Sequence, residues 1–512
     1  MLITVSLLLF WCTICFSQKR NAVWCFGHYS AIDFNLQPPN PDSSIAISRG
    51  SCASICDSNG GLQFYVAADT VALYASTMNG GKVYNNTHQL MQGGDSLVTL
   101  AWYNEQIVIP KPNSQNLYYV FTIGVTNSFG FYYSIVDLSL NGGLGAVIQK
   151  NFQLNNAPMT DCLSAIKHGN GRDWWVICRK SSVPNGGSNN VFYKYLITPN
   201  GISNVIVQHI GSLNTTNAGN ICFSSDGSFL IFSNLRGMVE KFDFNRCNGQ
   251  ISNPITIFPE HFISGSIYIN YWGSALSKND KVLYVSQSNT QSHLFQYDLT
   301  APNIAATEDT IWTQNFPINA AGTLRLAPDN KIYLACAYVP LNAPNYPYAD
   351  SMYNMDNMNL SVINAPDSLG AACNFQPYSF YLGGKRTYWG LPNNPNYDMP
   401  ALAGSPCDTL TGLYQTFAGS VKPTIQTTYV TAWQKLFVNA QNIKGKNGVL
   451  KIFELNGKEV FSSKGEASTA SSIAANGGYY TLDVDCSNFA SGLYLVNLQT
   501  TLENITTKFL KQ

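Results

Sequence analysis

The chain has 512 residues, with only 11% charged and 13% aromatic residues and a formal net charge of zero. Globular proteins carry about a quarter charged residues, so this composition, rich in Asn, Gly, Ser and Thr, favours a turn-rich all-β fold over a helical or disordered chain. The chain has no basic excess to attract a polyanion, so nucleic acid is excluded as an expected partner.

A short apolar run over residues 1–17 opens the chain and is followed by a Gln-Lys-Arg sequence. The run is too short to span a bilayer comfortably, so it predicts a secretory signal peptide cleaved between Ser17 and Gln18. Cys12 and Cys15 leave a lipoprotein signal as the alternative. No later stretch is long and apolar enough to predict a transmembrane segment.

The next part of the chain repeats one pattern, an apolar strand, a tight polar turn and a second apolar strand, as in residues 223–232. The turns recur at intervals of 49 to 57 residues, at Asn59, Asn113, Gly169, Asp226, Asp280 and Asp329. Asn, Asp and Gly tolerate the positive φ angles of tight hairpins. A near-constant period of this size predicts a β-propeller.

The propeller is expected over residues 23–397. The span from Trp24 to Asn396 covers 373 residues, which at a period of 54 predicts seven blades, with six as the alternative. We expect the seventh blade to combine the N-terminal strand at 24–26 with the late segment 386–391. Joining the two ends in this way would leave no strand edge exposed.

Residues 398–431 are rich in Pro, Gly, Ser and Thr and predict a linker, in which Cys407 is a candidate for a bond to the propeller. Beyond it, residues 432–512 alternate apolar and polar side chains. The turn Asn456-Gly457 between two such runs is a strong hairpin signal. These features predict a small antiparallel β-sandwich.

Three sequence segments follow one another in this last unit. They are residues 449–460 around the Asn-Gly turn, residues 482–496 with a Gly-Leu-Tyr-Leu-Val strand, and the basic, apolar end of the chain. They resemble the type A C-terminal sorting domain of the type IX secretion system of Bacteroidota. The family's usual opening Pro-Asn-Pro phrase is replaced here by residues 436–440. The resemblance implies that the sorting signal includes Gly492, Tyr494, Val496, Lys508 and Lys511.

A cargo of this kind is expected to pass through the periplasm and to be secreted or held on the outer-membrane surface by the type IX secretion machinery. In many members of the family the sorting domain is cleaved. The propeller resembles one that often precedes such domains, through Trp24-Cys-Phe-Gly27 and residues 52–65, 108–112, 118–122 and 389–393. This second resemblance implies architecture but no activity.

No catalytic, cofactor-binding or metal-binding residues are predicted. The six histidines are scattered over separate repeats, at His28, His88, His168, His209, His261 and His293, and none has metal-ligand spacing. Neither a Gly-x-Ser-x-Gly elbow nor a phosphate-binding glycine loop is present. The oxygen-rich stretch 57–61 is interpreted as a hairpin turn, not as a calcium loop.

Cysteine and aromatic residues complete the predictions. Removing the signal peptide leaves 11 of the 13 cysteines, an odd number that implies a free thiol. One of Trp174 and Trp175 is expected to pack between blades, whereas exposed aromatic rings suit sugars and peptides. The segment 337–359 departs most from the repeat, and its tyrosines are the candidate ligand-binding loop: Tyr346, Tyr348 and Tyr353.

We therefore expect an exported protein whose propeller is a non-catalytic binding module for a glycan or a protein. A propeller hydrolase or lyase acting on polysaccharide is the alternative, and a spacer without ligand is a third possibility. An enzyme should show two carboxylates, or a histidine and a carboxylate, converging in one cleft. A binding module should show aromatic and amide side chains without such a pair.

Overall fold

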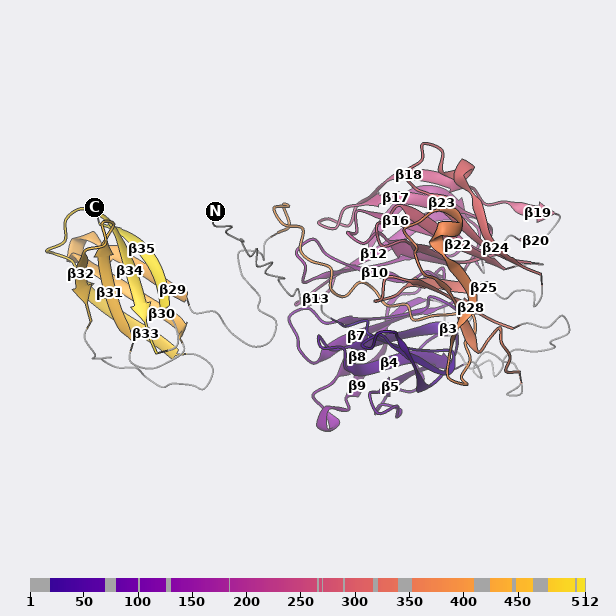
Figure 1. Ribbon diagram of the computed structural model, residues 1–512, viewed down its shortest axis with the longest axis horizontal. Coiled ribbons are helices and arrows are strands. Elements are labelled where there is room, and N and C mark those ends of the chain that lie inside the picture. The colour runs from indigo at the N-terminus through magenta and orange to yellow at the C-terminus, as the bar shows by residue number, and fades with distance from the viewer. Residues whose placement is uncertain are drawn as a thin grey trace, which may run out of the picture. The chain divides into compact units, whose positions relative to one another are not determined.

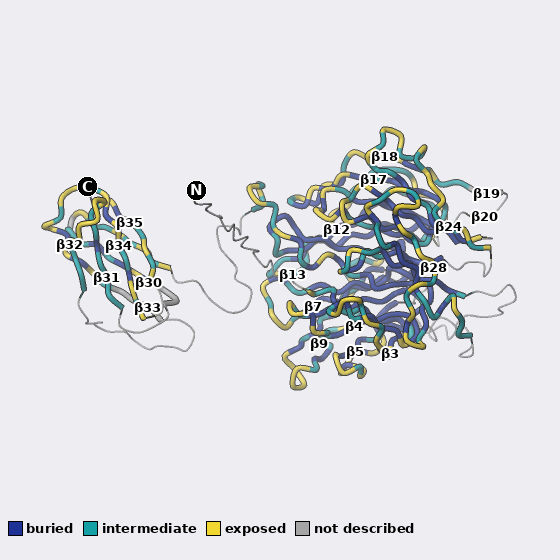
Figure 2. Tube along the Cα trace, viewed as in Figure 1, coloured by how far each residue is buried: buried dark blue, intermediate teal, exposed yellow. Residues whose placement is uncertain are grey.

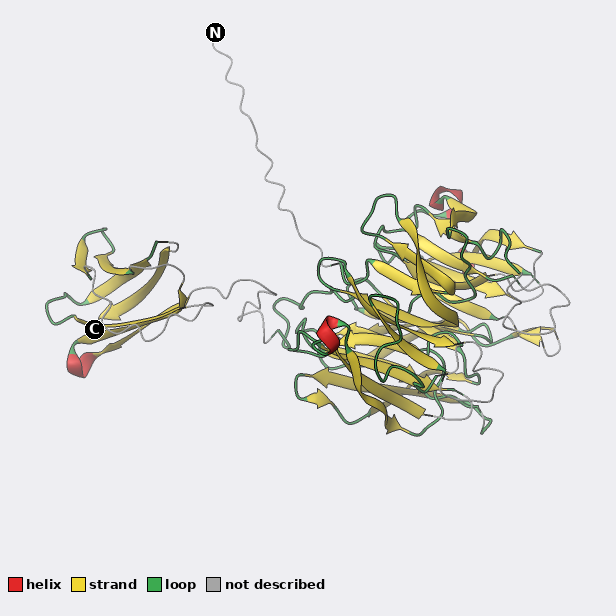
Figure 3. Ribbon diagram, turned by 90° about the horizontal axis from the view of Figure 1, so that it is seen from below, coloured by secondary structure: helices red, strands yellow, loops and turns green. Residues whose placement is uncertain are grey.

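The computed structural model describes residues 19–69, 80–99, 102–125, 130–183, 185–264, 267–268, 270–288, 291–315, 321–338, 352–408, 424–443, 448–463, 478–501 and 504–511. The chain divides into two compact units, Met1–Thr411 and Gly412–Gln512. Helical structure in the described residues is limited to 3-10 turns of three or four residues (Figure 3). The predicted all-β fold is confirmed.

In the first unit, antiparallel sheets follow one another along the chain (Figure 1). One sheet consists of β6 (Gln106–Pro110), β7 (Leu117–Gly124), β8 (Gly130–Asp137) and β9 (Ala146–Asn155), and the next of β10 (Ser164–Lys167), β11 (Trp174–Arg179), β12 (Asn189–Thr198), β13 (Gly201–Ile202) and β14 (Ile206–Asn214). The sheet after these consists of β15 (Gly219–Phe223), β16 (Phe229–Asn234), β17 (Val239–Phe244) and β18 (Ile251–Phe258). Two more follow, one of β21 (Tyr271–Leu276), β22 (Val282–Ser288), β23 (Ser292–Asp298) and β24 (Asp309–Gln314), and one of β25 (Ala321–Leu326), β26 (Ile332–Cys336), β27 (Asn359–Ile363) and β28 (Phe375–Tyr381). A short hairpin, β19 (Phe262–Ser264) with β20 (Ile267–Tyr268), precedes β21. The first strand of each sheet lies beside the first strand of the next, as a propeller requires.

The N-terminal strands are β1 (Val23–Phe26), β2 (His28–Asp33), β3 (Asn40–Cys56), β4 (Leu62–Asp69) and β5 (Gly81–Asn85). The long strand β3 pairs with β2 through its first half and with β4 through its second half. Its second half also lies beside β6. The strand β3 is therefore shared: its first half pairs within β1–β2–β3, and its second half pairs within β3–β4–β5.

The two ends of the first unit meet. The Trp24 ring packs edge-on against Phe34 at 4.9 Å and against Tyr333 of β26 at 6.0 Å between ring centroids. The Thr323 N–H donates to the Trp389 carbonyl at 2.6 Å, and the Trp389 N–H donates to the Arg49 carbonyl at 3.0 Å.

The ring is therefore closed, and the predicted β-propeller is confirmed. The segments 24–26 and 386–391 were expected to meet at the closure. Residues 24–26 and Leu391 do share one core cluster, and next to them the His28 N–H donates to the Arg386 carbonyl at 2.8 Å. The seven-blade count stays a prediction.

Packing between neighbouring sheets buries strands on both faces, as Figure 2 shows by the dark blue interior strands. Adjacent residues of β11 demonstrate this. Trp174 is buried in a cluster shared with β6–β8, whereas Trp175 is buried in a cluster shared with β15–β17. Both indole rings therefore belong to the core between sheets.

The second unit contains two antiparallel sheets. One has the order β29 (Thr424–Val430), β30 (Lys435–Ile443) and β33 (Gly478–Asp485), and the other has the order β32 (Glu459–Ser462), β31 (Val449–Glu454), β34 (Gly492–Gln499) and β35 (Asn504–Lys511). Side chains from both sheets form one core, which includes Leu436, Val438, Ile452 and Val496. The predicted β-sandwich is confirmed, and so is the Asn456-Gly457 hairpin, in which Gly457 has φ of 86°.

Replacing Trp24 by alanine should destabilise the propeller. Its ring is 1% exposed and joins the first strand to β26, so Trp24→Ala is expected to lower the free energy of unfolding by about 3–5 kcal/mol. Urea denaturation followed by tryptophan fluorescence measures this change. Leu36→Ala, at a side chain that is 53% exposed, is the control and should lose less than about 0.5 kcal/mol. Equal effects of the two substitutions would contradict the role of Trp24 in closure.

Candidate functional site

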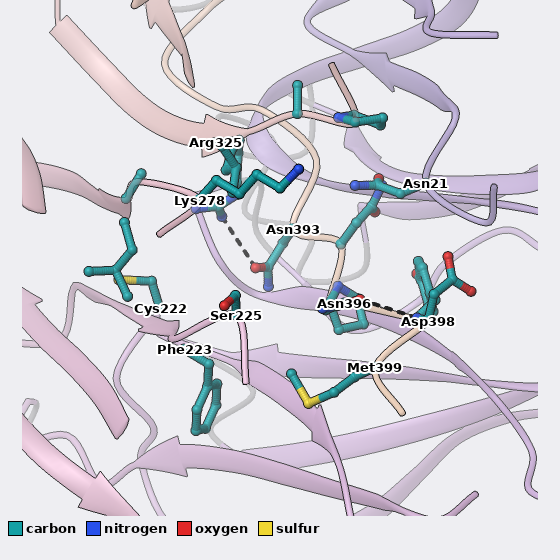
Figure 4. Close-up of a pocket in the computed structure, with 18 of the residues that line it drawn as sticks. Asn21, Cys222, Phe223, Ser225, Lys278, Arg325, Asn393, Asn396, Asp398 and Met399 are labelled. Carbon is teal, nitrogen blue, oxygen red and sulfur yellow. Dashed lines mark hydrogen bonds between the residues drawn. The ribbon is translucent and has the colours of Figure 1, made fainter. Parts of the chain in front are cut away.

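A cavity of about 650 Å³ lies in the propeller unit, where the first strands of the sheets end (Figure 4). Its lining comes from the N-terminal segment, from β6, β10, β15, β21 and β25 with the turns that follow the last three, and from residues 393–399. This volume lies within the range of ~300–1,000 Å³ that is typical of small-ligand sites. The end of the propeller channel is therefore the candidate site.

The Arg325 guanidinium forms one wall of this cavity. It donates from Nε to the Pro392 carbonyl at 3.1 Å and from its two terminal nitrogens to the amide oxygens of Asn104, Asn220 and Asn393 at 2.5, 3.3 and 3.2 Å. Burial lowers the pKa of Arg325 to about 10. Since these partners are neutral oxygens, the positive charge is solvated without being neutralised.

The same asparagines extend the network to other sheets. The Asn393 side-chain nitrogen donates to the carbonyls of Gln106 and Leu163 at 3.1 and 2.8 Å, and that of Asn220 donates to the Ser274 carbonyl at 3.1 Å. We call Asn104, Asn220, Arg325 and Asn393 the axial network. It connects β6, β10, β15, β21 and β25 across the channel.

Residues 392–408 follow the last sheet and cover part of the cavity. The Tyr397 hydroxyl donates to the Val108 carbonyl at 2.9 Å, and Met399 is 3% exposed. A disulfide joins Cys407 to Cys247, which confirms the expected bond between Cys407 and the propeller. Residues 398–408 of the predicted linker thus pack on the propeller, whereas the domain boundaries stay predictions.

The two carboxylates that line the cavity already have partners. Asp280 accepts from the Ser225 backbone N–H and hydroxyl at 2.8 and 2.5 Å, and Asp398 accepts from Arg20 at 3.3 Å. Burial raises the pKa of Asp280, and it raises that of Asp398 to about 6 although the Arg20 charge opposes the shift. Neither carboxylate bonds to the other, and no histidine lines the cavity among the described residues.

Two of the six histidines are buried. His28 is 6% exposed and its Nδ1 lies 2.6 Å from the Tyr353 hydroxyl, while His168 is 8% exposed and its Nε2 lies 2.8 Å from the Cys247 carbonyl. Each ring thus has a structural partner outside the cavity lining.

An aromatic cluster lies at the beginnings of the first strands. The Arg49 guanidinium is 4.5 Å from the Trp102 ring and 4.6 Å from the Trp389 ring, and Trp272 stacks on Trp389 at 5.9 Å. Cation–π contacts of this kind stabilise by roughly 0.5–2 kcal/mol. Trp272 therefore packs against other rings and is only partly exposed.

Two buried carboxylates adjoin this cluster and were missed by sequence reasoning. Glu105 is fully buried, and Asp161 accepts from the backbone N–H groups of Tyr103 and Asn104 at 2.8 and 2.5 Å. Burial and the Glu105 charge raise the pKa of Asp161. No local sequence pattern distinguishes them from the other acidic residues among the 29 of the chain.

Lys278 was also not predicted as a site residue, although its position in the repeat distinguishes it. In the turns after β15, β21 and β25 the second residue is Ser225, Lys278 and Pro328 in turn. The neighbouring repeats have a small or rigid residue at this turn position, so a lysine there is not explained by the structure of the turn. Comparing the repeats position by position would have found it.

The predicted ligand-binding loop is only partly described. Tyr346 and Tyr348 lie outside the described residues. Tyr353 is partly buried, and its ring lies 4.5 Å from the Arg386 guanidinium carbon. It does not line the cavity. The ligand-binding role of these tyrosines stays a prediction.

The predicted sorting residues differ in burial. Tyr494 and Val496 are buried in the sandwich core, and Gly492 begins β34. Lys511 is 6% exposed, and its ammonium donates to the carbonyls of Cys486 and Phe489 at 2.6 and 2.7 Å, whereas Lys508 is exposed. Their roles in sorting stay predictions.

Residues 432–512 match the family described as the secretion system C-terminal sorting domain. Among solved structures, the chain is similar to the Dos1 propeller, with 11% identity and a TM-score of 0.40 over 73% of this chain and 86% of that chain. It is also similar to the β-propeller domain of Cps50 (Swd1) from Myceliophteria thermophila, with 9% identity and a TM-score of 0.31 over 62% of this chain and 94% of that chain. None of the curated proteins matches the chain.

The sorting-domain match confirms the resemblance found in the sequence. The chain is a cargo of the type IX secretion system that carries a β-propeller. Its sorting domain implies interaction with that machinery and export from the cell or to its surface. In the part of the chain that the structure describes, no helix has the length and apolar character needed to cross a membrane.

Lys167 beside this site should make stability depend on pH. The side chain is 9% exposed, with its ammonium 4.2 Å from the Trp174 ring, and burial lowers its pKa from 10.5 to about 7. Between these pH values the unfolded chain binds more protons than the folded chain, so this group makes stability rise with pH. Lys167→Met should be more stable than wild type at pH 7, by roughly 2–4 kcal/mol, and the difference should shrink toward pH 10.

Urea denaturation of both proteins from pH 6 to 10 measures this difference. Lys281→Met, at an exposed lysine, is the control and should follow wild type at every pH. A constant difference between Lys167→Met and wild type would show that the pKa of Lys167 is the same in the folded and unfolded chains, which contradicts this prediction.

Proposed function

We propose that this type IX cargo binds a glycan or protein ligand through its propeller, without converting the ligand chemically. The predicted signal peptide at 1–17 would first deliver the chain to the periplasm of a Bacteroidota cell. The sorting domain would then direct it to the outer-membrane surface or to the medium. The match of residues 432–512 supports the export part of this proposal.

One observation supports a binding role most directly. The cavity at the end of the channel is lined by serine, amide and apolar side chains, while its two carboxylates are occupied separately by Ser225 and Arg20. General acid–base catalysis requires a group that can reach the proton to be transferred. The described lining offers hydrogen bonds and apolar contacts instead, which suit recognition.

A polysaccharide hydrolase or lyase is the second candidate, because Glu105 and Asp161 form a buried acidic pair beside aromatic rings. Pairs of carboxylates with separated pKa values carry out glycoside hydrolysis. Release of reducing ends from polysaccharides by the full chain, abolished in Glu105→Gln, would establish this candidate and overturn the non-catalytic role.

The buried terminal lysine should matter more for export than the exposed one. Lys511→Met removes the ammonium that donates to the carbonyls of Cys486, Ser487 and Phe489 and should weaken the sandwich, so we expect at least a roughly fivefold drop in surface and secreted protein. Lys508→Met, the matched control, should be exported normally. Quantitative blots of periplasm, surface and medium measure both variants.

Deletion of 492–512, which removes β34 and β35, is the reference for complete failure and should trap the protein in the periplasm. Normal delivery of the deletion variant would refute the export role. Equal export of Lys511→Met and Lys508→Met would instead refute the role given to the buried ammonium.

The binding role is tested by applying the full chain to glycan and peptide arrays. We expect a ligand that Asn396→Trp blocks by filling the cavity, because Asn396 lines it and is exposed. Asn204→Trp, at an exposed residue outside the lining, should bind as wild type. No ligand on either array would favour the spacer function, and a ligand indifferent to Asn396→Trp would place binding elsewhere.

A further inference from the structure

The cavity offers cationic groups that the protein itself does not use. Lys278 and Lys19 are exposed residues of the lining, and their ammonium groups have no hydrogen bond or ion pair to other described residues. Figure 4 shows the Lys278 side chain extended from the wall toward the side that Asn21 lines. The Arg325 charge faces the same space and has only neutral partners.

The two carboxylates of the lining, in contrast, already bind donor groups of the protein. Asp280 is held by three bonds from Ser225, and Asp398 is paired with Arg20. The lining thus has three cationic residues against two carboxylates, and the carboxylates face donors of the protein. An incoming negative charge would meet attraction from Lys278, Lys19 and Arg325 with little opposing repulsion.

Other polar groups of the lining can form hydrogen bonds with the hydroxyl groups of a ligand. The Ser164 hydroxyl, the Gln37 amide and the Asn396 side-chain nitrogen line the cavity without a bond to another described residue. Hydroxyl and amide groups can donate to and accept from sugar hydroxyls. Phe34 and Phe223 add aromatic surface, which suits the apolar faces of sugar rings.

A peptide of the same size fits less well. Each of its residues brings a backbone N–H that must be satisfied once buried. The strongest acceptors of the lining, Asp280 and Asp398, are already occupied. The volume of about 650 Å³ also points to a small ligand and not to a protein surface.

We infer that the channel cavity binds a short acidic oligosaccharide, whose sugar carboxylate lies against Lys278 and whose hydroxyls bond to the serine and amide lining. This inference rests on the proposed binding function and names its ligand class. Lys278 is then the specificity-determining residue, because it distinguishes a uronic acid from the neutral sugar of the same shape.

Calorimetry of the full chain with trigalacturonic acid, with its methyl ester and with triglutamate tests the inference. The ester keeps the size and hydroxyls but removes the charge, so wild type should bind it roughly 10-fold more weakly than the acid. Lys278→Gln should shrink that difference by weakening the acid more than the ester, and Lys278→Arg should largely restore it. Lys281→Gln, at an exposed lysine outside the lining, is the matched control.

A second variant places a new charge in the cavity. Asn396→Asp should weaken the acid at least roughly fivefold more than the ester, because the new carboxylate repels only the charged ligand. Equal affinities of acid and ester, preference for triglutamate, or an unaltered acid affinity in Lys278→Gln would each overturn the inference. After any of these three outcomes, the proposed binding function would still stand if some ligand bound and Asn396→Trp blocked it. If no ligand bound at all, both the inference and the proposed function would be refuted.

Discussion

A positive charge held in the channel by neutral oxygens is the constraint on which the propeller depends. Burying a guanidinium is unfavourable unless each donor finds an acceptor. Arg325 meets this condition only when Asn104, Asn220 and Asn393 converge from separate parts of the chain. Arginine suits this position better than lysine, because its planar group carries five donors in a fixed geometry. Correct placement of the sheets and solvation of this charge therefore require each other.

The axial network also divides the channel into levels. Along the first strands, the aromatic cluster around Trp389 and Trp272 comes first, the asparagines and Ser274 follow, and the cavity lining comes last. Stacked rings form the first level, and the last level is lined by both polar and apolar side chains. The two ends of one channel thus have different chemistry, which explains why the cavity and the acidic pair of Glu105 and Asp161 support different candidate functions.

Much of the fold could be predicted because its signals are local. Each anchor of the repeat, from Asn59 to Asp329, lies in the turn between two consecutive strands of a sheet, where residue type directly sets the backbone geometry. The Asn456-Gly457 hairpin was predictable for the same reason. The site was not, because Arg325 and Asn104 are 221 residues apart and no local pattern records their contact. Trp174 and Trp175 show a related limit, since alternation cannot indicate that both faces of a strand are covered.

The shared strand β3 and the late segment after β28 have a consequence for biogenesis. The first sheet is completed by residues 386–391, and the disulfide spans 160 residues to reach Cys407. A nascent chain that has passed its first sheets thus still exposes an unpaired β edge until nearly four hundred residues have emerged. Such late, long-range pairing slows folding and invites aggregation. We therefore expect holdase chaperones to bind this cargo during its transit, and oxidation of Cys247 and Cys407 to attach residues 398–408 to the propeller only as the last step.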